Sequence, residues 1–341
     1  MCEHDAGTLS DNDPFYHFLA DEVMGNVLGY CPERPIFDVF CLDNSATVFR
    51  YAERKTFVNL VGKFYGRKWL HGRQTGEEEL RAEYMQREFD NLQKLRALGL
   101  DSYPHCVVRP LSVSQAHNCV LVEEFVFGTS FDCYVTAALQ SGNGDELYRK
   151  LTDLAWFFAH LHARSQSEVS VDQIRGLDYF GKMINDLSYW NIISVEQQQQ
   201  FLKLQDRWRA TGLLNTGKNV LTHGDAVFPN FLCSGEHGIT SIDLERLWPG
   251  DAAMDLGCVV AELKHLFFIY SHNIWASEPY IQHFYESYFN CLPKPADDFS
   301  TLTSRGRFYM GCYELRMSRN AWLDLDYRHM LINEAESCLQ I

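Results

Sequence analysis

The spacing of apolar positions changes near residue 127. Before it, short segments rich in β-branched and aromatic residues predominate, at residues 36–51, 58–65 and 119–126. Residues 76–98 instead show helical spacing, which ends at Gly99. After residue 127 helical patterns dominate, first at residues 146–164 and again from Asp255 onward. The pattern therefore predicts an α+β protein with two lobes, residues 1–127 and residues 128–341.

Composition limits the class of protein. A hydrophobic fraction of 46% is ample for a packed core. No apolar run approaches the roughly 18 residues that span a bilayer, so we expect no membrane partner. The acidic start of the chain, MCEHD, lacks the basic and then apolar pattern of a secretory signal. The 11 cysteines are scattered and form no CxxC pair, which indicates reduced thiols in a cytoplasmic protein and no zinc site.

The formal net charge is −15, which disfavours nucleic acid as a partner, since phosphate backbones attract basic surfaces. An acidic protein has a weak preference for a cationic substrate. Aromatic residues and the acids Glu262, Glu278 and Glu286 after Asp255 fit that preference, although core packing is the simpler explanation of the aromatics. Nothing in the sequence determines the oligomeric state.

The most informative stretch covers residues 221–245 and reads LTHGDAVFPNFLCSGEHGITSIDLE. Residues 234–238 have turn composition, so the flanking segments predict a hairpin that sets Asn230 roughly opposite Asp243. Two oxygen ligands at the open end of a hairpin suit Mg²⁺. Asp225, just before the hairpin, is placed to accept a hydrogen bond from an attacking hydroxyl. Phosphoryl transfer asks a protein for such positioning and for cancellation of phosphate charge.

HGDAVFPN at residues 223–230, followed by IDLE at residues 242–245, resembles the signature of the aminoglycoside phosphotransferase and choline kinase superfamily. These are small-molecule relatives of protein kinases. The resemblance implies a two-lobed, protein-kinase-like fold with an N-terminal antiparallel sheet, one long helix and a mainly helical C-terminal lobe. It implies Asp225 as the catalytic aspartate and Asn230 and Asp243 as Mg²⁺ ligands. Asp255 is either the N-cap of a helix or a brace for the catalytic loop, and the N-cap interpretation is the simpler one.

A kinase also needs a cation on the ATP phosphates, oriented by a carboxylate on a helix. Lys63 lies inside the predicted strand 58–65. Glu88 falls in the apolar stripe of the predicted helix, where an unpaired charge would be costly, so Lys63 is its natural partner. A solvated lysine and a glutamate at the helix edge are the alternative, and Glu83 is the second choice for the partner.

Two further nucleotide contacts follow from the resemblance. The turn at residues 43–46 would cover the phosphates with the backbone N–H groups of Ser45 and Ala46, although it contains no glycine. Main-chain groups of Glu124 and Val126 would hold the adenine edge, although a plain buried strand predicts the same composition. His162, in the helix 146–164, is expected to be a core histidine.

These observations predict an ATP-dependent phosphotransferase, with GTP as a possible substitute, that moves the γ-phosphate to a hydroxyl of a small molecule. Aminoglycosides, amino alcohols and sugars all remain open as acceptors. A protein kinase of the same fold is disfavoured because the triplet is His223-Gly224-Asp225 and not His-Arg-Asp. A catalytically silent nucleotide-binding or interaction protein has the missing glycine loop as its single support.

Overall fold

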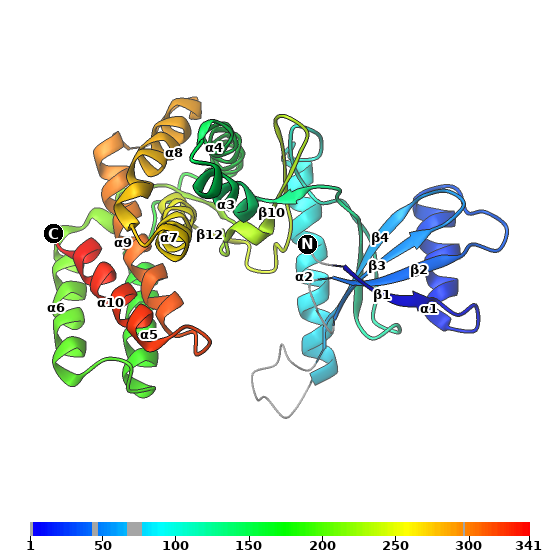
Figure 1. Ribbon diagram of the computed structural model, residues 1–341, viewed down its shortest axis with the longest axis horizontal. Helices are drawn as coiled ribbons and strands as arrows, with labels where there is room; N and C mark the ends of the chain where they lie inside the picture. The colour runs from blue at the N-terminus through cyan, green and yellow to red at the C-terminus, as the bar shows by residue number, and fades with distance from the viewer. Residues whose placement is uncertain (1–2, 43–46, 67–76, 296) are drawn as a thin grey trace. The chain divides into compact units, whose positions relative to one another are not determined.

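The computed structural model describes residues 3–42, 47–66, 77–295 and 297–341. Contacts divide the chain into two compact units (Figure 1). The first comprises Met1–Ser130 and Phe231–Arg246, and the second Phe131–Asn230 and Leu247–Ile341. The segment Phe231–Arg246 thus packs with the N-terminal part of the chain, although a simple division at residue 127 assigns it to the other lobe. No helix of the described residues is long and apolar enough to cross a bilayer.

The first unit is built on an antiparallel six-stranded sheet in the order β1-β2-β3-β4-β7-β6. The strands are β1 Glu3–Thr8, β2 Phe37–Leu42, β3 Val48–Glu53, β4 Asn59–Phe64, β6 Pro110–Ser114 and β7 Val120–Glu124. Helix α2, Glu77–Ala97, packs against β6 and β7, and is the long helix that the pattern predicts. The expected strands 58–65 and 119–126 correspond to β4 and β7.

A second helical segment in this unit was not predicted. Helix α1, Pro14–His17, continues directly into the π-helical turns η1, Phe18–Val27. Phe15, Leu19 and Val23 bury their side chains in one core with strand residues such as Leu60. Since side chains alternate along a strand, the neighbours Val61 and Lys63 point to the opposite face of the sheet. Figure 1 shows α1 and α2 on opposite sides of the sheet.

The predicted hairpin is present in a smaller sheet of the first unit, with the order β5-β11-β10-β8. Strands β10, Phe231–Ser234, and β11, Gly238–Ser241, are antiparallel, and Phe231 pairs with Ser241. Gly235, at φ 58°, begins the turn in a conformation that favours glycine. Strands β5, His105–Val107, and β8, Thr129–Ser130, complete the sheet. The paired residues of the hairpin end at Ser241, two positions before Asp243.

The second unit is mainly helical, as predicted. Its helices are α3 Phe131–Ser141, α4 Asp145–Ser165, α5 Gln173–Tyr189, α6 Val195–Thr211, α7 Ala252–Ser271, α8 Glu278–Cys291, α9 Phe299–Ser318 and α10 Leu325–Leu339. Short 3-10 turns lie at η3 Leu213–Asn215, η4 Phe228–Asn230 and η5 Ile274–Ser277. The strands β9, Asn219–Thr222, and β12, Trp248–Asp251, pair antiparallel at the entrance to α7.

Helix α7 is the centre of the second unit. It packs against α3, α9 and β9, and residues on every side of it are buried. At Gly257 the two helices α7 and α9 come so close that an added Cβ would lie 2.6 Å from the Cβ of Tyr309. Several aromatics after Asp255 are core residues, including Phe284, Tyr285 and Tyr288, while Trp275 is exposed. The packing of α7 therefore fixes the positions of the side chains in its first turn.

Candidate active site

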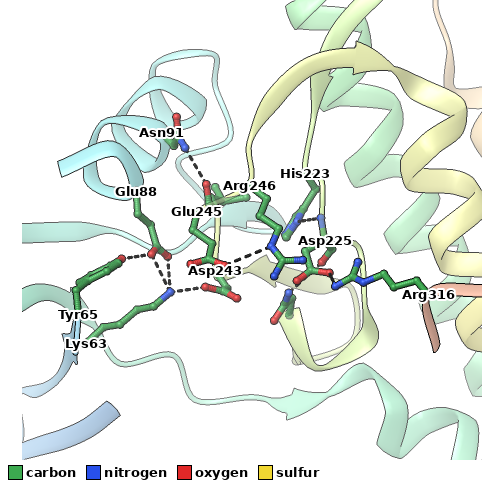
Figure 2. Close-up of polar contacts among 12 residues, drawn as sticks. Lys63, Tyr65, Glu88, Asn91, His223, Asp225, Asp243, Glu245, Arg246 and Arg316 are labelled. Carbon is green, nitrogen blue, oxygen red and sulfur yellow. Dashed lines mark hydrogen bonds and ion pairs between the residues drawn. The ribbon is translucent and has the colours of Figure 1, made fainter. Parts of the chain in front are cut away.

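Lys63 forms the buried ion pair with Glu88 that the helix pattern predicts. Its Nζ donates to Glu88 Oε1 at 2.9 Å and to Oε2 at 2.8 Å. The same Nζ contacts Asp243 Oδ1, and the Tyr65 hydroxyl also donates to Glu88 (Figure 2). The alternative partner Glu83 is solvent-exposed and pairs with Arg87. The first unit thus brings together a strand cation, a helix carboxylate and an aspartate from the IDLE segment.

The acids around Lys63 stabilise its charged form. Burial alone would lower the pKa of Lys63, but the carboxylates of Glu88 and Asp243 outweigh burial and hold the pKa above its ordinary value. Burial, helped by the charge of Asp243, raises the pKa of Glu245 to about 7. Burial also raises the pKa of Glu123 to about 8, with Glu88 adding to the effect. Carboxyl groups this close together repel one another when ionised, so binding of a further cation would stabilise their charged forms.

The donor set in this cluster fits a hard divalent cation. Carboxylate oxygens of Glu88, Asp243 and Glu245 lie within 4.8 Å of one another. Mg²⁺ prefers oxygen ligands from one or two carboxylates and completes its shell with water and phosphate oxygens. Asp243 adopts a left-handed conformation, φ 62°, and Asn91 Nδ2 fixes the next residue by donating to the Leu244 carbonyl at 2.8 Å. The backbone therefore holds the Asp243 carboxylate at a set position in the cluster.

The second unit contains the loop that carries Asp225. The loop follows β9, and Gly224 turns it with φ 79°. Asp255 in α7 accepts the N–H of His223 at 2.8 Å and the N–H of Gly224 at 3.0 Å. A buried carboxylate with two backbone donors is a strong brace, because neither oxygen is left unpaired. Asp255 therefore holds the loop from behind.

The N-cap interpretation of Asp255 was wrong. Asp251 caps α7 instead, accepting the N–H of Ala253 at 3.0 Å, and the buried Arg305 fixes that cap with Nε at 2.9 Å from Asp251 Oδ2. The sequence shows two aspartates at a spacing that allows either to cap, and strand β12 decides by ending at Asp251. One further turn along, Asp255 is free to point at the loop.

His162 is a buried core residue, as predicted, but it also orients Asp255. Its Nε2 lies 3.1 Å from Asp255 Oδ2, and its Nδ1 lies 2.9 Å from the Tyr288 hydroxyl. These hydrogen bonds form a continuous series from Tyr288 in α8, through His162 in α4 and Asp255 in α7, to the N–H groups of the loop. Three helices therefore set the position of the loop that carries Asp225.

Asp225 itself has a partner that sequence reasoning missed. Arg316 Nη2 donates to Asp225 Oδ1 at 2.8 Å (Figure 2). Asn230 Nδ2 donates to the Asp225 carbonyl at 2.9 Å, and no donor of the described residues contacts Asn230 Oδ1. The amide thus spans the loop and keeps an oxygen for a ligand. The single signal for Arg316 was its place as a cation in the last turn of a helix.

Two further pairs of residues were predicted to contact the nucleotide. Strand β7 ends at Glu124, whose N–H donates to the Arg109 carbonyl at 3.0 Å, and Val126 follows the strand end. Ser45 and Ala46 lie outside the described residues.

Comparison with known proteins identifies the family to which the chain belongs. The profile of the phosphotransferase enzyme family matches residues 69–288. No curated protein matches the chain by sequence. Similar solved structures include an aminoglycoside phosphotransferase in a ternary complex with streptomycin and ATP, which is 12% identical and covers 98% of this chain and 97% of its own, with a TM-score of 0.57.

Two further structures are similar. The ethanolamine kinase of Plasmodium vivax is 13% identical, covers 94% of this chain and 86% of its own, and has a TM-score of 0.57. The choline kinase of Streptococcus pneumoniae is 14% identical, covers 88% of this chain and 91% of its own, and has a TM-score of 0.52. At such identities the likeness shows the fold, and it confirms the expected protein-kinase-like α+β architecture.

Proposed function

The chain belongs to the phosphotransferase enzyme family, and we propose that it transfers the γ-phosphate of ATP to a hydroxyl of a small molecule. The observation that carries the proposal is the buried Lys63–Glu88 pair with Asp243 on the same ammonium. A buried ion pair adds little to stability, so a third charge drawn into it argues for a role beyond structure. Phosphoryl transfer needs such a cation and such carboxylates together.

The proposed roles divide between the two units. Lys63, oriented by Glu88, binds the nucleotide phosphates, and Asp243 and Asn230 are the metal ligands. Mg²⁺, when bound, supplies positive charge that offsets the charge on the phosphates. Asp225 accepts the hydrogen bond of the acceptor hydroxyl and orients it for in-line attack. The Asp255 brace keeps Asp225 in position during this step.

We propose residues 1–127 as the nucleotide-binding lobe and residues 128–341 as the catalytic and substrate-binding lobe. Main-chain groups of Glu124 and Val126 are the proposed contacts to the base. Because the N–H of Glu124 already donates to a carbonyl, the contact from this residue would have to come from its carbonyl oxygen. Ser45 and Ala46 remain the proposed phosphate contacts. GTP remains an alternative to ATP.

The proposal also concerns the chemical class of the acceptor. The similar structures are named for streptomycin, ethanolamine and choline, which are compounds with hydroxyl groups. An aminoglycoside, an amino alcohol or a sugar is therefore the proposed acceptor class for this chain. The helical unit is the part of the chain that we expect to select among them.

The test is consumption of ATP or GTP with Mg²⁺ across aminoglycosides, choline, ethanolamine, other amino alcohols and sugars. Turnover that depends on an acceptor and falls by about 10²–10⁴ in Asp225→Asn is the expected result. Asp101→Asn, which removes an exposed carboxylate, is the matched control and should leave turnover unchanged. Failure of the protein to bind any Mg²⁺–nucleotide would contradict the proposal.

A further inference from the structure

Arg316 lies in the last turn of α9 and points its guanidinium at Asp225. A guanidinium carries five N–H donors, and in the described part of the chain Asp225 is its sole hydrogen-bond acceptor. The side chain is 23% exposed, and its carbon Cζ lies 5.4 Å from the centre of the Tyr313 ring. Arg316 therefore presents unused donors beside the proposed catalytic carboxylate.

Two further cations lie near Arg316, and both pair with the same acid. Arg319, one turn further along, reaches back to Asp186, to which Lys182 also donates at 2.8 Å. Burial raises the pKa of Tyr179, and both guanidinium groups oppose that rise, so both lie near this hydroxyl. Two arginines and a lysine thus lie on the α5 and α9 side of the loop, together with the acids Asp186 and Asp225.

A further acid, Glu262, lies close enough to Arg316 for the guanidinium to affect its pKa. Glu262 in α7 is half-buried, and burial raises its pKa to about 7, while Arg316 acts in the opposite direction. A helix dipole explains a cation in the last turn of α9, but it does not explain why the guanidinium points at Asp225.

The Arg316–Asp225 pair has a chemical consequence. Asp225 Oδ1 already accepts a hydrogen bond from a charged donor, so this oxygen is less available to accept one from an acceptor hydroxyl. Guanidinium binds carboxylate and phosphate groups with two parallel hydrogen bonds, which is stronger than the single bond that it makes to Asp225. An acceptor that carries an oxyanion would draw Arg316 to itself and remove this donor from Asp225 Oδ1.

We propose that Arg316 binds an oxyanion of the acceptor, so that the acceptor is a hydroxy acid or a phosphorylated alcohol. This inference rests on the proposed function: it keeps phosphoryl transfer to a small-molecule hydroxyl and changes the expected acceptor class to one that carries an oxyanion. A neutral or cationic acceptor leaves Arg316 on Asp225 and gains nothing from the exchange. An anionic acceptor differs from the cationic substrate that the net charge of the whole chain favours. Acceptor binding depends on the side chains at the site, where Arg316 is a cation beside Asp225.

The experiment uses the full chain and matched acceptors that differ in the anion. Ethanolamine and serine differ by a carboxylate, and glycerol, glycerate and glycerol 3-phosphate form a neutral, carboxylate and phosphate series. Phosphoryl transfer from ATP with Mg²⁺ is measured for each, and binding of each to the protein loaded with Mg²⁺ and ADP is measured by calorimetry. Members with an oxyanion should bind and react, and the last series separates carboxylate from phosphate.

Variants separate acceptor binding from positioning of Asp225. Arg316→Gln should raise KM and the dissociation constant for the anionic acceptor about 10-fold or more, and Arg316→Lys should restore part of the loss. Arg149→Gln removes an exposed positive charge of the same unit and should match the unchanged protein. An Arg316→Gln effect on kcat alone, with KM unchanged, would assign Arg316 to positioning and overturn the inference.

The inference also falls if neutral or cationic acceptors react while their anionic counterparts do not, since the proposed function would then stand without it. It falls equally if no anionic member binds to the protein loaded with Mg²⁺ and ADP. Failure to bind Mg²⁺ and ADP at all is a distinct result, because it overturns the proposed function itself.

Discussion

Glu83 and Glu88 show at the scale of single residues how position decides chemistry. Both lie on α2, but Glu83 is 61% exposed and forms a surface pair, whereas Glu88 is fully buried against Lys63. A surface pair is worth little, while a buried carboxylate must find partners. The apolar neighbours of Glu88 in the sequence already indicate this difference, because helical spacing places them on the same face.

Glu123 provides a prediction on pH. Its Oε1 is buried without a partner, and its pKa is raised from 4.5 to about 8, chiefly by burial. Between these values the unfolded chain loses the proton while the folded protein keeps it, so this residue costs the native state stability as pH rises. Glu123→Gln should therefore gain about 2 kcal/mol or more of unfolding free energy over the parent protein between pH 5 and pH 8.5.

Urea unfolding of both proteins at the two pH values measures this difference. Parallel changes in the parent and in Glu123→Gln would show that Glu123 ionises alike in both states and would contradict the prediction.

At the scale of elements, α7 connects the hydrophobic core of the second unit to the loop that carries Asp225. Its buried faces pack on α3 and α9, and its first turn sends Asp255 to the loop N–H groups. The loop also has hydrogen bonds of its own, such as that from Asn230 Nδ2 to the Asp225 carbonyl, although Gly224 leaves its backbone permissive. Packing of the helix therefore adds to the order that the loop has by itself.

Loss of the Asp255 brace should affect both stability and turnover. Asp255→Asn places an amide donor against backbone donors, so we expect a loss of about 2–4 kcal/mol and a lower kcat. Tyr288→Phe removes the outermost hydrogen bond of the same series, to His162, and should cost about 1 kcal/mol. Urea unfolding and turnover measure both variants. Equal losses in the two would argue that the loop does not depend on Asp255.

The crossing of α7 and α9 gives a second prediction at this scale. A Cβ at Gly257 would meet Tyr309 Cβ at 2.6 Å and backbone atoms of Met310 and Gly306 at 2.8 and 2.9 Å. Backbone cannot rotate away, so Gly257→Ala should lose about 1–3 kcal/mol even though alanine favours a helix. Gly250→Ala is the control, since its nearest neighbour is an ordinary contact at 3.5 Å. Thermal unfolding of both tests the difference, and equal stability would contradict it.

At the scale of the whole molecule, the chain forms two units whose boundary does not follow chain order. The segment Phe231–Arg246 returns to the first unit and takes Asp243 with it. The second unit keeps Asp225, so the motif HGDAVFPN and the motif IDLE are divided between the units.

Nucleotide binding should stabilise the chain by mass action. At 100 times the dissociation constant, ATP with Mg²⁺ should add about 2.7 kcal/mol to the free energy of unfolding. Lys63→Gln should lose most of this ligand-dependent gain, whereas Lys203→Gln, at an exposed position on α6, should keep it. Thermal unfolding with and without nucleotide measures the gain, and an equal gain in both variants would exclude Lys63 from the nucleotide site.

Sequence by itself determined the local parts of this protein. Alternating and helical spacing predicted β4, β7, α2 and the hairpin, because these patterns depend on neighbours a few residues apart. The Lys63–Glu88 pair followed from the same patterns, since one buried charge required another. The segment 14–27 was missed because a short π-helical run lacks a regular period.

Only the tertiary structure decided which distant residues meet. Arg316 reaches Asp225 across 91 positions, and His162 reaches Asp255 across 93. No periodicity relates such positions, because their approach depends on how α4, α7 and α9 pack. The choice between Asp251 and Asp255 as cap had the same origin, since the end of β12 settled it. Local spacing thus determined the elements and the motif, and helix packing determined the partners of its central aspartate.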